Sequence, residues 1–127
     1  MKFKSQFERN VAKAFRKAGI KFTYEPVVLP FVQPKKDRKY TPDFELRFGN
    51  RAILVETKGK LTAEDRQKLV WVQEQHPRRP VVILFMNSDV RIRKNSPTTY
   101  AKWAEKAGFE YYDFRDGLPK GWYADKI

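Results

Sequence analysis

Apolar and polar residues alternate over residues 44–48, Phe-Glu-Leu-Arg-Phe, which is the period of a strand with one buried face. The dipeptide Gly49-Asn50 follows, and both residues tolerate the positive φ that a two-residue hairpin turn requires. The apolar run over 52–55 then predicts a returning strand. The pattern therefore predicts a β-hairpin in which Phe48 pairs with Arg51.

Counting outward from that pair places Asp43 directly opposite Glu56. Paired residues point to the same face of a sheet, with Cβ atoms about 5 Å apart. Lys58 lies two residues beyond Glu56 and shares that face. We therefore expect one polar face that brings these three side chains together. The opposite, core face would carry Phe44, Leu46, Phe48, Ile53 and Val55.

The segment before the hairpin predicts a helix and a strand. Ser5, with Glu8 three residues later, resembles a capping box, and an apolar stripe at helical spacing follows and ends before Gly19. Residues 21–28 then have the composition of a strand.

A stiff, basic segment connects this strand to the hairpin. Two prolines exclude a central strand or a helix from residues 29–34, Leu-Pro-Phe-Val-Gln-Pro. The run 35–39, Lys-Lys-Asp-Arg-Lys, predicts a basic loop that ends just before Asp43.

The pattern after the hairpin predicts two helices around a buried strand. Thr62 can cap a helix over 63–75. The continuous apolar run from Pro80 to Met86 is typical of a strand covered on both faces. Ser96, followed by proline, predicts the start of a third helix that ends near Gly108. This order of elements predicts an α/β fold in one domain, 1–127, with a mixed sheet flanked by helices.

Net charge favours a polyanionic partner. The 27 basic and 15 acidic residues give +12, and residues 1–40, with 11 basic and 3 acidic side chains, carry +8 of it. Such a field attracts nucleic acid or anionic membrane. The chain lacks a basic amphipathic helix with a large apolar face, an apolar run of the ~20 residues that span a bilayer, and the apolar stretch of a signal peptide. These absences predict a protein without a membrane partner. The absence of cysteine fits a reducing compartment, so we expect a cytoplasmic protein.

The polar face of the hairpin suits metal-dependent cleavage of a phosphodiester. Two close carboxylates repel each other unless a cation lies between them, and oxygen ligands suit Mg²⁺, with Mn²⁺ as a substitute. Lys58 would neutralise charge that develops on the phosphate. With a single histidine and no cysteine, a zinc site is not expected. The alternative is an ordinary exposed face with an incidental Asp43, Glu56 and Lys58.

Basic residues near this face are candidates for DNA contact. A loop of solvated charges is the alternative for the run before Asp43, and a helix start beside basic residues is a candidate phosphate site. The candidates are Lys35, Lys36, Arg38, Lys39, Lys60, Arg93, Lys94 and Ser96.

These residues resemble a known family. Pro42-Asp43 and Glu56-Thr57-Lys58 are similar to the signature of the PD-(D/E)xK nucleases. Longer segments resemble the endonuclease I family of the T-odd phages, which are Holliday-junction resolvases, in the same order over about residues 5–112. These segments are Gly19-Ile20-Lys21-Phe22, Tyr24-Glu25, Tyr40-Thr41-Pro42-Asp43-Phe44, Val55-Glu56-Thr57-Lys58-Gly59, Glu74-Gln75-His76-Pro77 and Ser96-Pro97-Thr98.

The resemblance implies a restriction-endonuclease-like fold and Mg²⁺-dependent cleavage of four-way and other branched DNA. It implies that Asp43 and Glu56 are metal ligands, joined by the backbone carbonyl of Thr57, and that Lys58 is the catalytic lysine. Glu8 would be a further active-site carboxylate. Because Glu8 also fits the capping box, its role stays open between the site and the helix cap.

The resemblance also implies an intertwined homodimer, with residues 29–39 containing the proline-bearing bridge and the basic loop. A stiff linker that cannot fold back favours exchange between protomers, and resolving a junction takes two symmetric cuts. A phage-encoded enzyme of this kind would act in the host cytoplasm. The alternatives are another nuclease of the superfamily, for repair or restriction, and a non-catalytic basic DNA-binding module.

Overall fold

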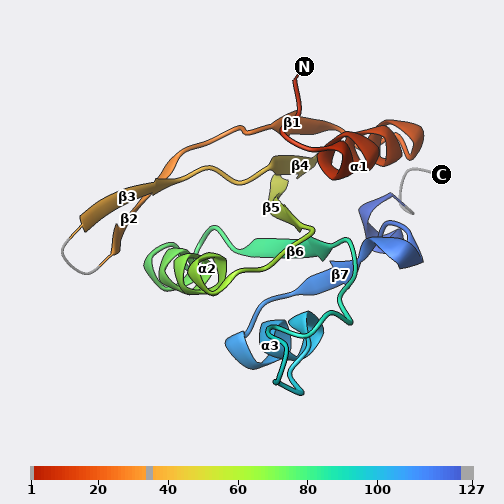
Figure 1. The fold of residues 1–127 in the computed structure, drawn as a ribbon. Helices are drawn as coiled ribbons and strands as arrows, with labels where there is room; N and C mark the ends of the chain where they lie inside the picture. The colour runs from red at the N-terminus through yellow and green to blue at the C-terminus, as the bar shows by residue number, and fades with distance from the viewer. Residues whose placement is uncertain (1, 34–35, 124–127) are drawn as a thin grey trace.

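The computed structural model describes residues 2–33 and 36–123, and a five-stranded mixed sheet lies at its centre (Figure 1). The strand order is β1-β4-β5-β6-β7, in which β1, β4 and β5 run antiparallel and β5, β6 and β7 run parallel. These strands are β1 (Phe22–Tyr24), β4 (Phe44–Phe48), β5 (Arg51–Lys58), β6 (Val81–Phe85) and β7 (Tyr111–Asp113).

Helices cover both faces of the sheet, as the predicted α/β class requires. Helix α1 (Gln6–Lys17) packs on the face that includes Val55, and α2 (Ala63–Gln75) and α3 (Tyr100–Ala107) pack on the face that includes Leu54 (Figure 1). Every residue of β6 is buried, which confirms the prediction from its continuous apolar run. Two short 3-10 helices, η1 (Phe114–Asp116) and η2 (Lys120–Trp122), follow β7.

The hairpin has the predicted register. Phe48 pairs with Arg51 across the Gly49-Asn50 turn, and Gly49 has a φ of 64°. The ladder ends at the pair Phe44–Val55, so Asp43 lies one residue beyond it.

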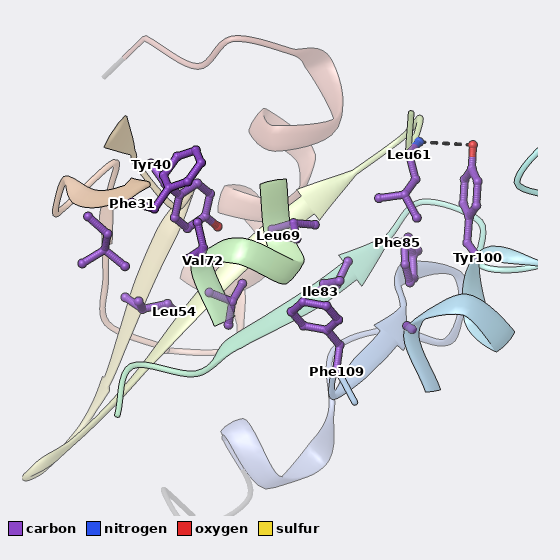
Figure 2. Packing of buried hydrophobic residues seen from close by; sticks show 13 residues of the cluster. Phe31, Tyr40, Leu54, Leu61, Leu69, Val72, Ile83, Phe85, Tyr100 and Phe109 are labelled. Atoms are coloured by element: carbon purple, nitrogen blue, oxygen red, sulfur yellow. Dashed lines mark hydrogen bonds between the residues drawn. The ribbon is translucent and has the colours of Figure 1, made fainter. Parts of the chain in front are cut away.

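The second face of the hairpin is more than a polar site, and this corrects the expectation of one core face and one polar face. Leu54 lies on it, is only 2% exposed, and belongs to a core with residues of α2 and α3. Figure 2 shows this core, in which the Tyr100 hydroxyl also accepts a hydrogen bond from the amide of Leu61 at 3.2 Å. The polar residues at the end of β5 therefore stand at the edge of an apolar layer.

The basic segment before Asp43 forms a strand, where the sequence predicts a loop. Strands β2 (Leu29–Gln33) and β3 (Lys36–Tyr40) pair antiparallel in a separate two-stranded arm that extends past α2 (Figure 1). The strand predicted over 21–28 is therefore wrong in length, because only β1 joins the main sheet. The prediction that 29–34 is not a central strand is confirmed over Leu29–Gln33, while Pro34 and Lys35 lie outside the described residues.

Side chains at the C-terminal end of α2 and its C-cap hold the arm against the helix. The side chain of Gln75 donates a hydrogen bond to the backbone carbonyl of Val32 and accepts one from the backbone amide of Val32. The ring of His76 contacts the carbonyl of Pro30. Phe31 packs in the same core as Leu69 of α2. The arm is thus fastened by both backbone and apolar contacts.

The third helix begins later than predicted. Thr99 caps α3, and the hydroxyl of Ser96 instead accepts a hydrogen bond from the amide of Thr98 at 3.1 Å. The backbone of Ile92 also bonds to Thr98, so the residues before α3 form a closed loop. The predicted helix start at Ser96 is wrong because this local bonding competes with the helix, whereas Gly108 ends the helix as expected.

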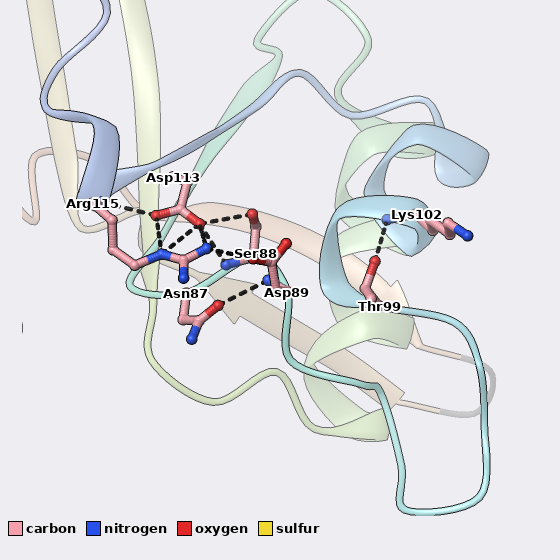
Figure 3. A network of polar contacts seen from close by, with 7 residues as sticks. All are labelled: Asn87, Ser88, Asp89, Thr99, Lys102, Asp113 and Arg115. Atoms are coloured by element: carbon pink, nitrogen blue, oxygen red, sulfur yellow. Dashed lines mark hydrogen bonds and ion pairs between the residues drawn. The ribbon is translucent and has the colours of Figure 1, made fainter.

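Asp113, at the end of β7, fixes the loop that follows β6. Its carboxylate accepts hydrogen bonds from the amide and hydroxyl of Ser88, both at 2.8 Å (Figure 3). It also forms an ion pair with Arg115 at 2.7 Å. Figure 3 also shows Arg115 reaching Asp89 at 2.8 Å. This network ties the ends of two parallel strands together.

None of the described helices has the length and apolar character needed to cross a membrane.

Candidate active site

The end of the hairpin locks Asp43 to strand β5. Its Oδ2 atom accepts hydrogen bonds from the amide and the hydroxyl of Thr57, both at 2.9 Å. Its backbone carbonyl accepts from the amide of Glu25 at 2.8 Å, which fixes the main chain as well. Asp43 is only 8% exposed.

Glu56 lies on β5 and is 7% exposed. Its Oε1 atom accepts a hydrogen bond from the hydroxyl of Tyr40 at 2.6 Å, and its Oε2 atom lies 3.3 Å from Nζ of Lys58. The contact between Glu56 and Lys58 confirms that they share a face. Tyr40 is a partner that the sequence reasoning missed. Its place beside Thr41-Pro42-Asp43 gave a weak indication.

Both carboxylates of this pair have raised pKa values, for which burial is the largest cause. Burial, then the charge of Glu56 and that of Glu8 raise the pKa of Asp43 to about 8, against the hydrogen bonds from Thr57. Burial also raises the pKa of Glu56, although Lys58 and Tyr40 oppose the shift. Without a cation, such carboxylates favour protonation, because their charged forms are unfavourable. A divalent cation between them would stabilise the charged forms.

The carboxylate of Glu8 does not complete the capping box of its own helix. Ser5 caps α1 by accepting from the amide of Glu8, while Oε1 of Glu8 accepts from the hydroxyl of Tyr24 and the amide of Lys4. Only the Ser5 half of the predicted capping box is therefore served. The carboxylate of Glu8 is buried, and its charge contributes to the raised pKa of Asp43.

Lys58 lies between the sheet and helix α2. Its Nζ atom is 3.3 Å from Glu56 and 3.3 Å from Oδ1 of Asp65, and its side chain is 18% exposed. Sequence reasoning missed Asp65, although its place three residues after Thr62 is that of a capping box. Lys68, one turn further along α2, places its ammonium 5.4 Å from the centre of the Tyr40 ring, and its charge lowers the pKa of Glu56 against the effect of burial.

The predicted DNA contacts fall in three places. Arg38 and Lys39 are exposed on β3 and line a cavity of about 560 Å³ together with Lys68 and Trp71 of α2. Lys60 is exposed just beyond β5. Lys36 lies on β3, and Lys35 falls outside the described residues.

The third place is the loop before α3, where the predicted helix start is wrong. Arg93 and Lys94 are exposed, but Ser96 is buried and bonded to Thr98. Because α3 starts only at Tyr100, the expected phosphate site at a helix start beside these residues does not form.

The described part of the chain contains no group of three or more His, Cys, Asp or Glu side chains arranged to hold a metal ion. The candidate donor set is therefore the pair of carboxylates Asp43 and Glu56, for which backbone, water and phosphate oxygens would complete the ligands. Mg²⁺ commonly binds through one or two carboxylates together with water and substrate phosphate.

The fold is shared with a solved protein of unknown function, AF1548. The two structures superpose with a TM-score of 0.52 at 11% identity, over 90% of this chain and 59% of that one. The likeness supports the fold alone.

Two curated relatives match over most of the chain. Endodeoxyribonuclease 1 of enterobacteria phage T3 is 41% identical over 111 residues, which are 87% of this chain and 71% of that protein. Endonuclease I of Escherichia phage T7 is also 41% identical over 111 residues, with 87% and 72% covered. The family model of phage endonuclease I matches residues 1–126, and the chain therefore belongs to the phage endonuclease I family.

Proposed function

We propose that this protein is a metal-dependent endodeoxyribonuclease that resolves four-way and other branched DNA by paired phosphodiester cuts. The observation that carries the proposal is the pair of buried carboxylates Asp43 and Glu56, of which the charge of Glu56 raises the pKa of Asp43, with the ammonium of Lys58 3.3 Å from Glu56. The names of the T3 and T7 relatives and the net charge of +12 support a DNA substrate.

Asp43 and Glu56 would hold Mg²⁺, with Mn²⁺ as a substitute, and the carbonyl of Thr57 would add a ligand. Their raised pKa values fit this role, because a bound cation would relieve the repulsion that burial intensifies. When bound, the ion would lower the pKa of a water molecule and stabilise charge on the phosphate.

The remaining residues have separate tasks in this proposal. The ammonium of Lys58 would donate to a phosphate oxygen or to the attacking water. Tyr40 holds one oxygen of Glu56, which leaves the carboxylate in a fixed orientation. Glu8 would add negative charge beside Asp43 and bind a water or a second ion from the side of α1.

Substrate binding would use the basic surface near this site. Arg38 and Lys39 stand on the arm, and Lys60 follows the strand that contains Glu56. Contacts of this kind to phosphates fix the position of DNA without reading its sequence. Lys35, Lys36, Arg93 and Lys94 remain further candidates, whereas the buried Ser96 does not suit direct contact.

Two cuts placed symmetrically across a junction require two active sites. We propose a homodimer in which the proline-bearing segment 29–39 joins the protomers by exchange, so that contacts of the β2–β3 arm that lie within one chain in the structure would form with the partner. The arm would then set the distance between the two sites.

Cleavage of a labelled four-way junction and of its separate duplex arms, with Mg²⁺ and with Glu56→Ala in parallel, tests the proposal. We expect paired cuts in the junction only, which the variant loses while it still binds. Equal cutting of both substrates would indicate a general nuclease of repair or restriction type. Binding without cutting would indicate a non-catalytic DNA-binding module.

A further inference from the structure

The ammonium of Lys58 is held from two different elements. Glu56 contacts it from its own strand, and Asp65 contacts it from the first turn of α2, each at 3.3 Å. Lysine has a flexible four-carbon side chain, so a single partner leaves its ammonium free to swing. Two partners on separate elements restrict it to the space between sheet and helix.

The two oxygens of Asp65 have different partners. Oδ2 accepts a hydrogen bond from the backbone amide of Thr62 at 3.0 Å and completes the capping box of α2. Oδ1 faces the ammonium of Lys58. The hydroxyl of Thr62 accepts the amide of Asp65 at 3.1 Å in return. The backbone amide of Thr62 therefore fixes the carboxylate, and the other oxygen of that carboxylate is directed at the lysine.

We propose that Asp65 is a positioning residue for the reaction: its carboxylate, which the backbone amide of Thr62 holds through Oδ2, keeps the ammonium of Lys58 at the scissile phosphate through Oδ1. The inference rests on the proposed function, in which Lys58 is the catalytic lysine. An ammonium has three N–H donors, so two carboxylate partners leave one donor for the phosphate or the attacking water. Asp65 acts through Lys58 and need not touch DNA.

The electrostatics of the pair agree with this geometry. Burial lowers the pKa of Lys58, but the charges of Glu56 and Asp65 outweigh it and keep the pKa above its ordinary value. These are the two carboxylates that contact the ammonium, from β5 and α2. Removing the charge of Asp65 would therefore leave the ammonium with Glu56 as its one carboxylate partner among these two.

Two variants separate positioning from helix capping. Asp65→Asn keeps one oxygen for the amide of Thr62 but loses the charge opposite Lys58. Thr62→Ala loses the hydroxyl cap but keeps the amide that holds Asp65 and the ion pair with Lys58. Asp65→Glu restores the charge on a longer side chain and serves as the conservative variant.

Cleavage of the four-way junction with Mg²⁺ gives the first readout. We expect Asp65→Asn to lower kcat about 10- to 100-fold with little change in KM, as misplacement of a catalytic group does. We expect Asp65→Glu to recover part of the loss and Thr62→Ala to stay within about twofold of the wild type. If Asp65→Asn cuts at the rate of Thr62→Ala, the positioning role is wrong.

Chemical denaturation in EDTA of Lys58→Met, Asp65→Asn and the double variant gives the second readout and does not depend on nuclease activity. Because the ion pair between Asp65 and Lys58 is already lost in either single variant, we expect the double variant to lose less stability than the sum of the two single losses. Strictly additive losses would overturn the inference. If the wild type cuts no branched DNA, the proposed function fails, and the double-variant cycle still decides whether Asp65 holds Lys58.

Discussion

The hydroxyl of Tyr40 donates to Oε1 of Glu56 at 2.6 Å, and this bond joins the last residue of the β2–β3 arm to the strand that forms the active site. Tyr40 is 1% exposed and packs with Phe31 and Leu54. The position of the arm and the orientation of Glu56 are therefore linked through one buried side chain.

We expect Tyr40→Phe to lower the single-turnover rate of junction cleavage about 10-fold and to destabilise the fold by about 1–3 kcal/mol, because a buried carboxylate oxygen loses its donor. Tyr111→Phe is a matched control, since it removes a hydroxyl that donates to exposed Glu105. Rates and thermal unfolding of both variants check the prediction. A Tyr40→Phe variant with the rate of the control would show that the bond does not matter for Glu56.

Asp43→Asn should stabilise the metal-free protein at neutral pH while it abolishes cleavage. A carboxyl with a higher pKa in the folded than in the unfolded state binds more protons when folded, so its contribution to stability falls as pH rises. The pH interval of this loss runs from the ordinary pKa of the carboxyl, 3.8, to its pKa in the folded protein, about 8. The asparagine oxygen can still accept from Thr57.

Thermal unfolding in EDTA at pH 5 and at pH 8 checks this prediction. We expect the variant to gain roughly 1–3 kcal/mol over the wild type at pH 8 and less at pH 5. A variant that is less stable than the wild type at pH 8 would contradict the account of Asp43 as a strained carboxylate.

Divalent cation should stabilise the wild-type protein through the same residue. A ligand at 100 times its Kd adds about 2.7 kcal/mol to the stability of a folded protein that alone binds it. We expect Mg²⁺ and Mn²⁺ to raise the Tm of the wild type but not that of Asp43→Asn, and EDTA to reverse the effect. An equal rise in both proteins would place the ion elsewhere.

Replacing Asp113 should destabilise the fold without any direct effect on the site. Asp113→Ala leaves the amide of buried Ser88 without its acceptor and breaks the ion pair with Arg115, so we expect a loss of about 1–3 kcal/mol. Arg115, then Ser88 hold the pKa of Asp113 well below its ordinary value, and the stabilisation should fade as pH falls into the acid range. Chemical denaturation at pH 7 and pH 3 measures it.

The exposed Asp116 provides the control for this clamp. Asp116→Ala removes a carboxylate three residues further along and should change the stability by less than about 0.5 kcal/mol. Equal losses in both variants would mean that the network around Asp113 is not what stabilises this end of the sheet.

Neutralising Arg38 and Lys39 together should weaken DNA binding and flatten its salt dependence. Each lost phosphate contact reduces the slope of log K against log salt by about 0.9. Titrations of junction DNA at salt concentrations from about 50 to about 200 mM check the change, because phosphate contacts make the affinity fall steeply over this range. Lys102→Gln with Lys106→Gln removes equal charge from exposed positions of α3, and an equal flattening there would assign the effect to net charge alone.

Much of the fold and the centre of the site could be predicted because local rules agree there. The hairpin register followed from strict alternation and a Gly-Asn turn, and it placed Asp43 and Glu56 within reach of each other. Strand β6 followed from its continuous apolar run. In these segments, the local preferences and the tertiary structure require the same conformation.

The misses have tertiary causes. Strand β7 has three residues and exists because it pairs with β6, so no periodicity could reveal it. Lys36–Tyr40 is charged like a loop but pairs with β2 and packs beside α2. Tyr40 and Asp65 complete the site from elements whose positions the sequence did not give. Ser96 formed a local turn where the sequence favoured a helix cap.

Cleavage of a supercoiled plasmid that extrudes a cruciform tests the central claim most directly. Two cuts within one binding event give a linear molecule, whereas isolated single cuts give a nicked circle. We predict that the wild type with Mg²⁺ produces mainly linear DNA and that Glu56→Ala leaves the plasmid supercoiled. Accumulation of nicked circles, or cutting by Glu56→Ala at the wild-type rate, would contradict a dimeric resolvase that uses the hairpin site.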